Sequence, residues 1–491
     1  MLAAIFVVSR LIYFGLGVRP DSSPLYLFLQ YLDPVLLKHS LWESLFYLRE
    51  QPPGFNLYLG LLLKFVGEDH ISVFVGLHWL LGLGLGFSLF ALMLDLQIAR
   101  GIALLVTAVF LVSPITVLYE NWLFYAFPVT ALLGISAWAL YLFLRDRRML
   151  HAVLFFSCLF LVAAIRGSYH LVWFLLIAVG LLIAARSDWR KIVIAAGVPG
   201  LLLTAIYVKS FVMFGDVVIG AQVFAKMNYA AMVQAQVNPE FLRNLVKKGT
   251  ISPILLMPAY VPSIEIHAPL VPRPALTGHP ALDQARKTGG AVNWNSVWMA
   301  RIGEKFYRDA RVVRSLYPGL FFRQLVRNVQ YYFYPADYTY PFYPFMPGRS
   351  KDAIRLQGIL RWYDFLTTGV FNNSEQFWYD FLTTGVFNNS ERFWITWLVL
   401  PACLLTGIVE VVGWIIKQAF DNPAMNARQI TILFALFNIG YCAAATILLS
   451  VSDQNRYRDE VSALYAILLG LLLNAAWRLW QMSRARPLPS H

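Results

Sequence analysis

The chain has 491 residues, of which 58% are hydrophobic and only 14% are charged. Soluble domains are roughly 45–50% apolar and about 25% charged, so the composition excludes an ordinary soluble protein. The formal net charge of +13 does not indicate nucleic-acid binding, because the basic residues mostly lie in short loops between apolar runs, as the positive-inside rule describes. The sequence therefore predicts an all-α polytopic membrane protein with no nucleic-acid partner.

Ten apolar runs approach the roughly 20 residues that cross the hydrocarbon core. They cover approximately residues 2–18, 71–94, 101–118, 123–144, 150–165, 169–185, 191–213, 394–416, 429–451 and 459–477. A further run, 54–67, is short and carries Asn56 and Lys64, so we expect it to stay at the membrane surface. Ten spans place the basic loops on the cytoplasmic side and residues 20–67 and 214–393 outside. If 54–67 crossed instead, the N-terminus would move outside and the first loop would no longer share a side with the insertion.

The first external loop, residues 20–67, carries two helix-start patterns. Ser23-Pro24 and Asp33-Pro34 each place a capping residue before a proline, which suits the first turn of a helix. The second pattern predicts an amphipathic helix in the membrane interface, with apolar positions Leu37, Leu41, Leu45 and Leu48.

We expect three parts: a membrane catalytic bundle (1–213), an external insertion (214–393), and C-terminal spans with a cytoplasmic tail (394–491). Frequent proline between Pro253 and Pro280 argues against long helices there. Val312–Val329 predicts a basic amphipathic helix that lies against anionic lipid. Tyr331–Pro347 is either an aromatic belt or a platform for an acceptor, and Trp362–Phe377 is duplicated almost unchanged in Trp378–Phe393.

Cysteine and metal chemistry have little support in the sequence. Cys158, Cys403 and Cys442 all lie inside apolar runs and are expected to be buried packing residues. We find no metal-binding His pair on a helix, no phosphate-binding glycine loop and no nucleophile elbow. The glycines of the run 82–86 (GLGLG) are expected to allow close helix packing. No cofactor is predicted, although a divalent metal requirement is left open.

Acids and arginines from distant segments are expected at the outer rim, where charged side chains usually have a task. The candidate catalytic acids are Asp21, Asp33 and Glu120, and the candidate phosphate ligands are Arg166, Arg456 and Arg458, because Arg suits phosphate oxygens. Each has a structural alternative. Asp33 is placed to cap a helix, Glu120 to cap or pair locally, and the arginines to anchor headgroups. Asp21 has only the alternative of a solvated loop acid, and His170 that of an interfacial residue.

Three features resemble the membrane glycosyltransferases of the GT-C type, in particular the bacterial branch related to protein O-mannosyltransferases and aminoarabinose transferases. They are an acid after the first span (Asp21), the corner Gln51-Pro52-Pro53 before an apolar run, and the turn Arg456-Tyr457-Arg458 before a late span. The resemblance covers residues 1–213 and 394–480. Many relatives have two adjacent acids where Asp21 is followed by Ser22, and His in place of Gln51.

This resemblance implies a single inverting transfer of a sugar from a polyprenyl-phosphate donor to a glycan, lipid or protein acceptor. Asp21 would be the general base, and Gln51, Tyr457 and His170 would contact substrate. The enzyme would lie in the bacterial inner membrane with its active site facing the periplasm. The alternatives are a transporter or flippase of a lipid-linked or anionic substrate, which favours mid-membrane charges and broken helices, and a ligase or polymerase of lipid-linked glycans.

Overall fold

The computed structural model describes residues 1–215, 222–260, 264–333, 394–421, 427–449 and 454–484. These residues form helices joined by turns, and the only β-type pairings among them are two isolated bridges. The predicted aromatic run beyond residue 333 and the duplicated segment lie outside the described residues.

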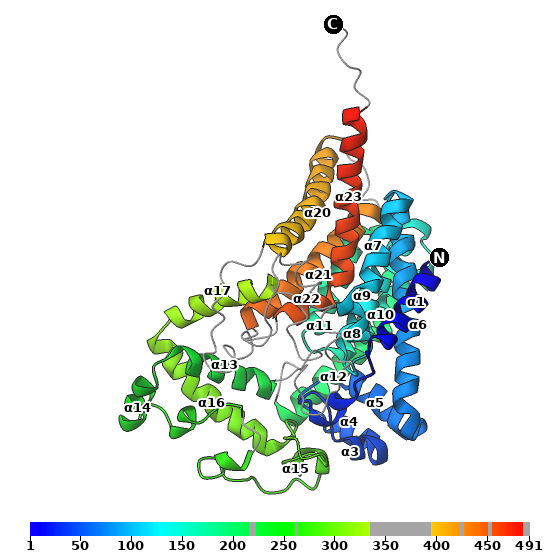
Figure 1. Ribbon diagram of the computed structural model, residues 1–491. Coiled ribbons are helices and arrows are strands. Elements are labelled where there is room, and N and C mark those ends of the chain that lie inside the picture. The colour runs from blue at the N-terminus through cyan, green and yellow to red at the C-terminus, as the bar shows by residue number, and fades with distance from the viewer. Residues whose placement is uncertain (216–221, 261–263, 334–393, 422–426, 450–453, 485–491) are drawn as a thin grey trace.

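The apolar helices match the ten predicted runs (Figure 1). Six helices of the described chain are long and apolar enough to cross a membrane. A bent pair makes a seventh, with an angle of 53° between its halves, and three helices are apolar but shorter. The six long helices are α6 (His70–Asp95), α9 (Ala126–Asp146), α12 (Trp189–Phe214, after the turn η2, Arg186–Asp188), α20 (Trp394–Asp421), α21 (Ala427–Leu449) and α23 (Ser462–Arg484). The bent pair consists of α7 (Arg100–Val112) and α8 (Pro114–Glu120). The three shorter apolar helices are α1 (Leu2–Gly15), α10 (Met149–Ile165) and α11 (Leu171–Ala184). The chain is therefore an all-α, multi-pass membrane protein.

Small residues allow the bundle to close. A Cβ on Gly82 would lie 2.9 Å from a carboxylate oxygen of Glu120, and one on Gly86 would lie 2.7 Å from Leu111. Glycine thus permits α6 to approach α7 and α8, as the sequence predicted. Cys158, Cys403 and Cys442 are buried and unbridged, in agreement with a packing role.

One end of the bundle gathers basic side chains that the sequence placed on a common side. Arg145 pairs with Asp95 at 2.9 Å, and Arg428 and Arg478 donate to the carbonyl groups of Leu96 and Gln97. The short helices α3 and α4 lie at the other end (Figure 1).

The first loop folds into α2 (Ser23–Leu27), α3 (Pro34–His39), α4 (Leu41–Phe46) and α5 (Pro53–Phe65). The prediction of a single helix after Asp33 is wrong, because the helix is interrupted at Ser40 and forms two short helices, α3 and α4. The four predicted leucines are nevertheless all buried. A short turn, η1 (Gly67–Asp69), separates α5 from α6, and α5 is not among the described helices that meet the length and hydropathy requirements of a span.

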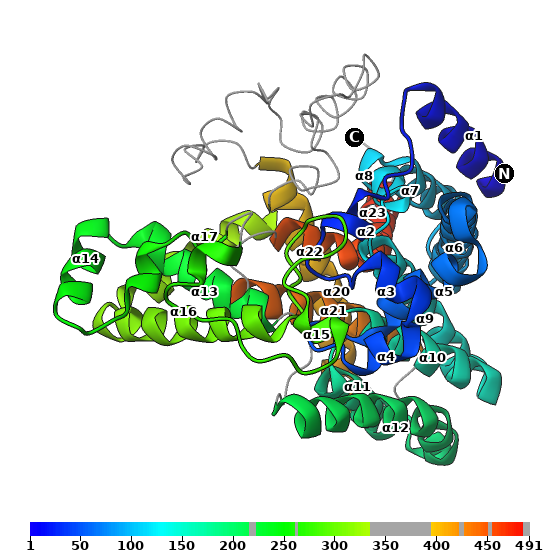
Figure 2. The ribbon, with the colours of Figure 1, turned by 90° about the horizontal axis from the view of Figure 1, so that it is seen from below.

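The insertion forms a helical unit beside the bundle (Figure 2). Its elements are α13 (Gln222–Gln236), α14 (Pro239–Lys247), η3 (Pro253–Leu256), η4 (Ile264–His267), α15 (Pro280–Asp283), α16 (Val297–Leu316) and α17 (Gly319–Phe333). They pack around a core of their own. The described residues of the proline-rich stretch contain only short turns, as predicted. The helix predicted over Val312–Val329 is instead divided at Tyr317-Pro318, because proline cannot continue a helix without losing a hydrogen bond.

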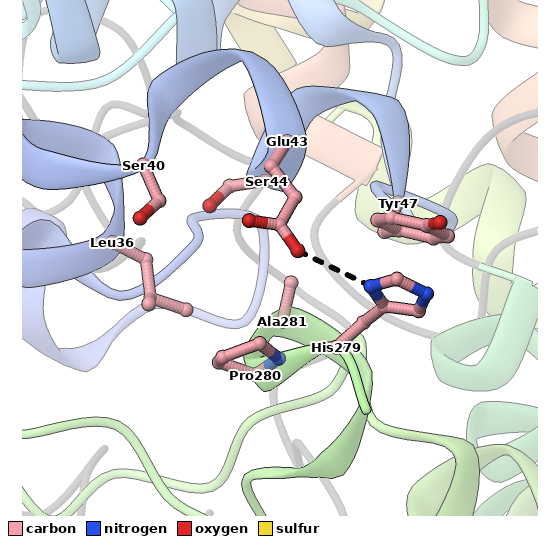
Figure 3. Close-up of a pocket in the computed structure, with 8 residues that line it drawn as sticks. All are labelled: Leu36, Ser40, Glu43, Ser44, Tyr47, His279, Pro280 and Ala281. Atoms are coloured by element: carbon pink, nitrogen blue, oxygen red, sulfur yellow. Dashed lines mark hydrogen bonds and ion pairs between the residues drawn. The ribbon is translucent and has the colours of Figure 1, made fainter. Parts of the chain in front are cut away.

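The insertion also binds the first loop through polar contacts. The side chain of Asn295 accepts from the backbone of Arg49 at 2.7 Å and donates to the carbonyl of Tyr47 at 3.0 Å. His279 stacks on Tyr47 and lies 3.2 Å from Glu43 (Figure 3). These contacts hold α15 beside α4, so the first loop is covered on one side by the insertion.

Candidate functional site

Arg166 is the centre of a buried polar cluster. It follows the last residue of α10 in an extended conformation and is 5% exposed. Its Nη1 donates to the hydroxyl of Tyr125, and its Nε lies 3.0 Å from Glu460 Oε1. The guanidinium carbon lies 4.6 Å from the ring centre of Tyr125 and 4.2 Å from that of Tyr457. Both contacts have cation–π geometry.

Arg456 reaches the same aromatic ring from the short helix α22 (Gln454–Glu460). Its guanidinium carbon is 5.3 Å from the ring centre of Tyr457 and 5.0 Å from that of Phe124. The structure therefore brings together Arg166, Arg456 and Tyr457, three residues that the sequence singled out from two distant segments.

Glu460 is the member of this cluster that the sequence analysis missed. It lies four residues after Arg456 on α22, a spacing that places two side chains on one helical face, and it is fully buried. Burial raises the pKa of Glu460, and the charges of Arg166 and Arg456 oppose that rise. For Arg166, burial would lower the pKa, but the charge of Glu460 and the neighbouring tyrosines raise it.

The cluster has unused hydrogen-bonding capacity. Nη2 of Arg166 and both carboxylate oxygens of Glu460 make no hydrogen bond with any residue that the structure describes, although the two side chains form a close ion pair. Buried polar atoms usually have a hydrogen-bond partner. Two guanidinium groups beside one carboxylate leave an excess positive charge that a phosphate group can match.

The Gln51-Pro52-Pro53 corner lies against the end of α10. A Cβ on Gly54 would lie 2.6 Å from the carbonyl oxygen of Ala164, two residues before Arg166. The ring of Phe55 packs on Tyr125 with 5.8 Å between ring centres. Gln51 itself is buried. Glycine at position 54 is therefore what allows the first loop to approach the arginine cluster.

The backbone of Asp21 pairs with residues 121–124, a segment that we call the wall of the arginine cluster because Phe124 contacts Arg456. The backbone N–H of Asp21 donates to Asn121 at 2.8 Å, and its carbonyl accepts from Leu123 at 2.9 Å. The next residue of that wall is Phe124, and the guanidinium of Arg456 lies over its ring. The expected capping role of Ser23 is wrong, because Ser23 is itself the first residue of α2 and its N–H donates to Asp21 Oδ1 at 3.0 Å. Asp21 thus has a local structural role that the sequence analysis did not foresee.

The two other candidate acids have their contacts elsewhere. Asp33 caps α3 by accepting from Val35 at 2.9 Å, as the structural alternative predicted, and its second oxygen accepts from Thr288 of the insertion. Glu120 forms a bidentate ion pair with Arg10 of α1, with atom separations of 3.0 and 2.5 Å. The expected pairing of Glu120 within a short turn is therefore wrong, because its partner lies 110 positions away.

Arg458 and His170 also make contacts of their own. Arg458 donates to the carbonyl of Tyr332 at 2.7 Å, at the end of α17. His170 is the N-cap of α11 and accepts from Val172 at 3.2 Å through Nδ1. Burial lowers the pKa of His170, which keeps this accepting nitrogen unprotonated at neutral pH.

A small pocket is present where α4 meets the insertion (Figure 3). Ser40, Glu43, Tyr47 and His279 are among its lining residues, and its volume of about 10 Å³ is roughly that of one water molecule. It is too small to hold a sugar or a lipid headgroup.

No protein-family model and no curated protein sequence matches this chain. Among solved structures, the chain is similar to the archaeal oligosaccharyltransferase AglB from Archaeoglobus fulgidus, determined in complex with an inhibitory peptide and a dolichol-phosphate. The TM-score is 0.41 and the sequence identity is 14%. The match covers 100% of this chain and 52% of AglB, so the chain spans about half the length of that protein.

Proposed function

We propose that this protein is an inverting GT-C-type glycosyltransferase of the bacterial inner membrane. It transfers a sugar from a polyprenyl-phosphate-linked donor to a glycan, lipid or protein acceptor at the periplasmic face. The observation that carries the proposal is the convergence of Arg166 and Arg456 on Tyr457. Beside them, Nη2 of Arg166 and the carboxylate oxygens of Glu460 make no hydrogen bond with the residues that the structure describes.

The arginine cluster supplies what a lipid-phosphate leaving group requires. Arg166 and Arg456 are both at most 5% exposed, and electrostatic stabilisation is stronger where water is excluded. When the bond between the anomeric carbon and the phosphate oxygen breaks, the phosphate keeps the electron pair and gains negative charge. Fixed guanidinium groups stabilise that charge as it develops.

Asp21 is the proposed general base. It accepts the proton of the acceptor hydroxyl or amine while the acceptor atom bonds to the anomeric carbon from the face opposite the leaving phosphate. A positioned base typically contributes about 10²–10⁴-fold to the rate. Its support is the backbone pairing of Asp21 with the wall that carries Phe124, together with the sequence resemblance.

The test is sugar transfer from a defined polyprenyl-phosphate donor in detergent. We expect Asp21→Asn to lower the turnover of folded protein by about 10²–10⁴-fold, and Arg456→Lys to weaken phosphate stabilisation because lysine lacks the planar fork. Asp69→Asn in the exposed turn before α6 is the matched control and should transfer normally. Unchanged turnover of folded Asp21→Asn would reject the assignment of the base.

Two observations favour the second candidate, a transporter of a lipid-linked or anionic substrate. A buried ion pair joins α1 to α8, and the α7–α8 span is bent by 53°. Buried charges and broken helices both occur in transporters. Proteoliposomes containing a fluorescent polyprenyl-phosphate lipid separate the two functions. Movement of that lipid between leaflets without sugar transfer would favour the transporter, and transfer without movement favours the enzyme.

A further inference from the structure

Glu460 is an unusual neighbour for a phosphate site, because it places a negative charge where an anion is expected. Its carboxylate lies 3.0 Å from Arg166 and has no hydrogen bond among the described residues. An ionised carboxylate taken out of water without hydrogen bonds is costly. The ion pair with Arg166 offsets only part of that cost.

The incoming phosphate and Glu460 compete for the same cation. Arg166 already uses Nη1 on Tyr125 and has Nη2 available, while its Nε faces Glu460. A phosphate that contacts Arg166 and Arg456 would stand beside the carboxylate at close range. Two like charges at one buried site favour protonation of the weaker acid.

We infer that Glu460 is a positioning residue that neutralises Arg166 while the donor site is empty and takes up a proton when the donor phosphate binds. This inference rests on the proposed function, because it requires that the arginine cluster be the phosphate site. The proton leaves the net charge of the cluster unchanged on binding, because two guanidinium groups stand beside one carboxylate in the empty site and beside one phosphodiester anion in the occupied site. Protonated Glu460 also becomes a donor and can form a hydrogen bond to the phosphate oxygen that displaces it from Arg166.

Other titratable and charged groups surround Glu460, and each could also respond to a bound anion. They are Arg166 and Tyr169 between α10 and α11, Tyr125 before α9, Cys442 on α21, and Arg456 and Asp459 on α22. Arginine stays charged and tyrosine stays neutral at neutral pH, because the ordinary pKa values of both side chains lie well above it. Burial raises the pKa of Asp459 to about 7, so Asp459 is the competing source of any pH dependence.

The inference predicts the sign of a pH effect. An anion beside Glu460 raises the pKa of its carboxyl further above the value in the empty site. Between these two pKa values, binding takes up one proton, and affinity falls by up to about tenfold for each unit rise in pH. Glu460→Gln removes the titrating group, so its affinity should not depend on pH in this way.

The probe is geranyl methyl phosphate, a phosphodiester that has the isoprenoid chain and no sugar and carries one negative charge throughout the range. Binding is measured by isothermal titration calorimetry in detergent, from a pH of about 5.5 to about 8.5, which lies above the ordinary pKa of a glutamate side chain, because burial raises the pKa of Glu460. We expect wild-type affinity to fall as the pH rises. Glu460→Gln should bind with constant affinity, and at the upper end roughly tenfold more tightly than wild type, as expected for removal of one nearby negative charge.

Two further measurements isolate Glu460. Asp459→Asn is the matched control on the same short helix, and it should keep the pH dependence of wild type. Wild-type titrations in two buffers of different protonation enthalpy count the protons taken up on binding, and this measurement does not require that any variant folds.

The outcomes separate the inference from the proposed function. Binding by wild type with no proton uptake, or a pH dependence that Glu460→Gln retains, would overturn the role of Glu460 and leave the phosphate site intact. Loss of the pH dependence in Asp459→Asn alone would assign it to Asp459 and also overturn the inference. If neither wild type nor Glu460→Gln binds the probe, both the phosphate site and the inference are rejected.

Discussion

Replacing Glu120 by glutamine leaves the guanidinium of Arg10 buried without a counter-charge. In the native chain, Arg10 and Glu120 form two parallel contacts of 3.0 and 2.5 Å, and their side chains are 1% and 0% exposed. Arg10 also donates to the carbonyl of Leu111 at 2.7 Å. Removing one partner of a buried ion pair typically costs about 3–5 kcal/mol, because the remaining charge is left uncompensated. We expect Glu120→Gln to lose that much free energy of unfolding.

The assay is equilibrium unfolding in mixed detergent micelles, followed by tryptophan fluorescence. The insertion supplies a matched control, because Glu265 and Arg286 form the same bidentate contact with the same separations of 3.0 and 2.5 Å, but with side chains 49% and 37% exposed. Glu265→Gln should barely change stability, since solvent and salt screen an exposed pair. The double variant Arg10→Met with Glu120→Gln should recover part of the loss. Equal effects of Glu120→Gln and Glu265→Gln would refute the claim that burial decides the strength of the pair.

Three further predictions concern the first loop and Lys287, a residue of the insertion that donates to the carbonyl of Phe28 in that loop. Gly54→Ala should destabilise the protein by about 1–3 kcal/mol through overpacking, because the new Cβ would lie 2.6 Å from the carbonyl oxygen of Ala164; a melting temperature equal to that of wild type would contradict the contact. Asp33→Ala should cost on the order of 1–2 kcal/mol by removing the α3 cap and the acceptor of Thr288, and limited proteolysis should then cleave residues 285–290 faster than in wild type. Burial lowers the pKa of Lys287 from its ordinary 10.5 to about 7, although the charge of Asp33 opposes this shift. Between these two pH values the unfolded chain binds more protons than the folded chain, so the free energy of unfolding should rise with pH. Lys287→Met should flatten this part of the stability profile, and a slope that persists unchanged would assign it to another group.

Local sequence patterns predicted the elements of this protein well. The number and positions of the apolar helices follow from run length, since about 20 apolar residues are required wherever a helix crosses the bilayer. The capping role of Asp33 follows from the Asp-Pro pair at the start of α3. Local patterns were less reliable at breaks. The division at Ser40 and the division at Tyr317-Pro318 interrupt hydrophobic periodicities that continue on both sides.

The partners of the charged residues were decided only by tertiary structure. The sequence offered Glu120 as a candidate catalytic acid, and only the packing of the helices identifies Arg10 as its partner. Glu460 belongs to no sequence motif, and only the structure places Arg166, at the end of α10, next to it. Ion pairs of this kind join residues that are far apart in sequence, and their identity depends on how closely helices approach, which glycines such as Gly54 and Gly82 permit. The chain alone thus determined which segments form long apolar helices. Only the packed bundle decided which charges neutralise one another, because the cost of burying a charge depends on the partner that the fold places next to it.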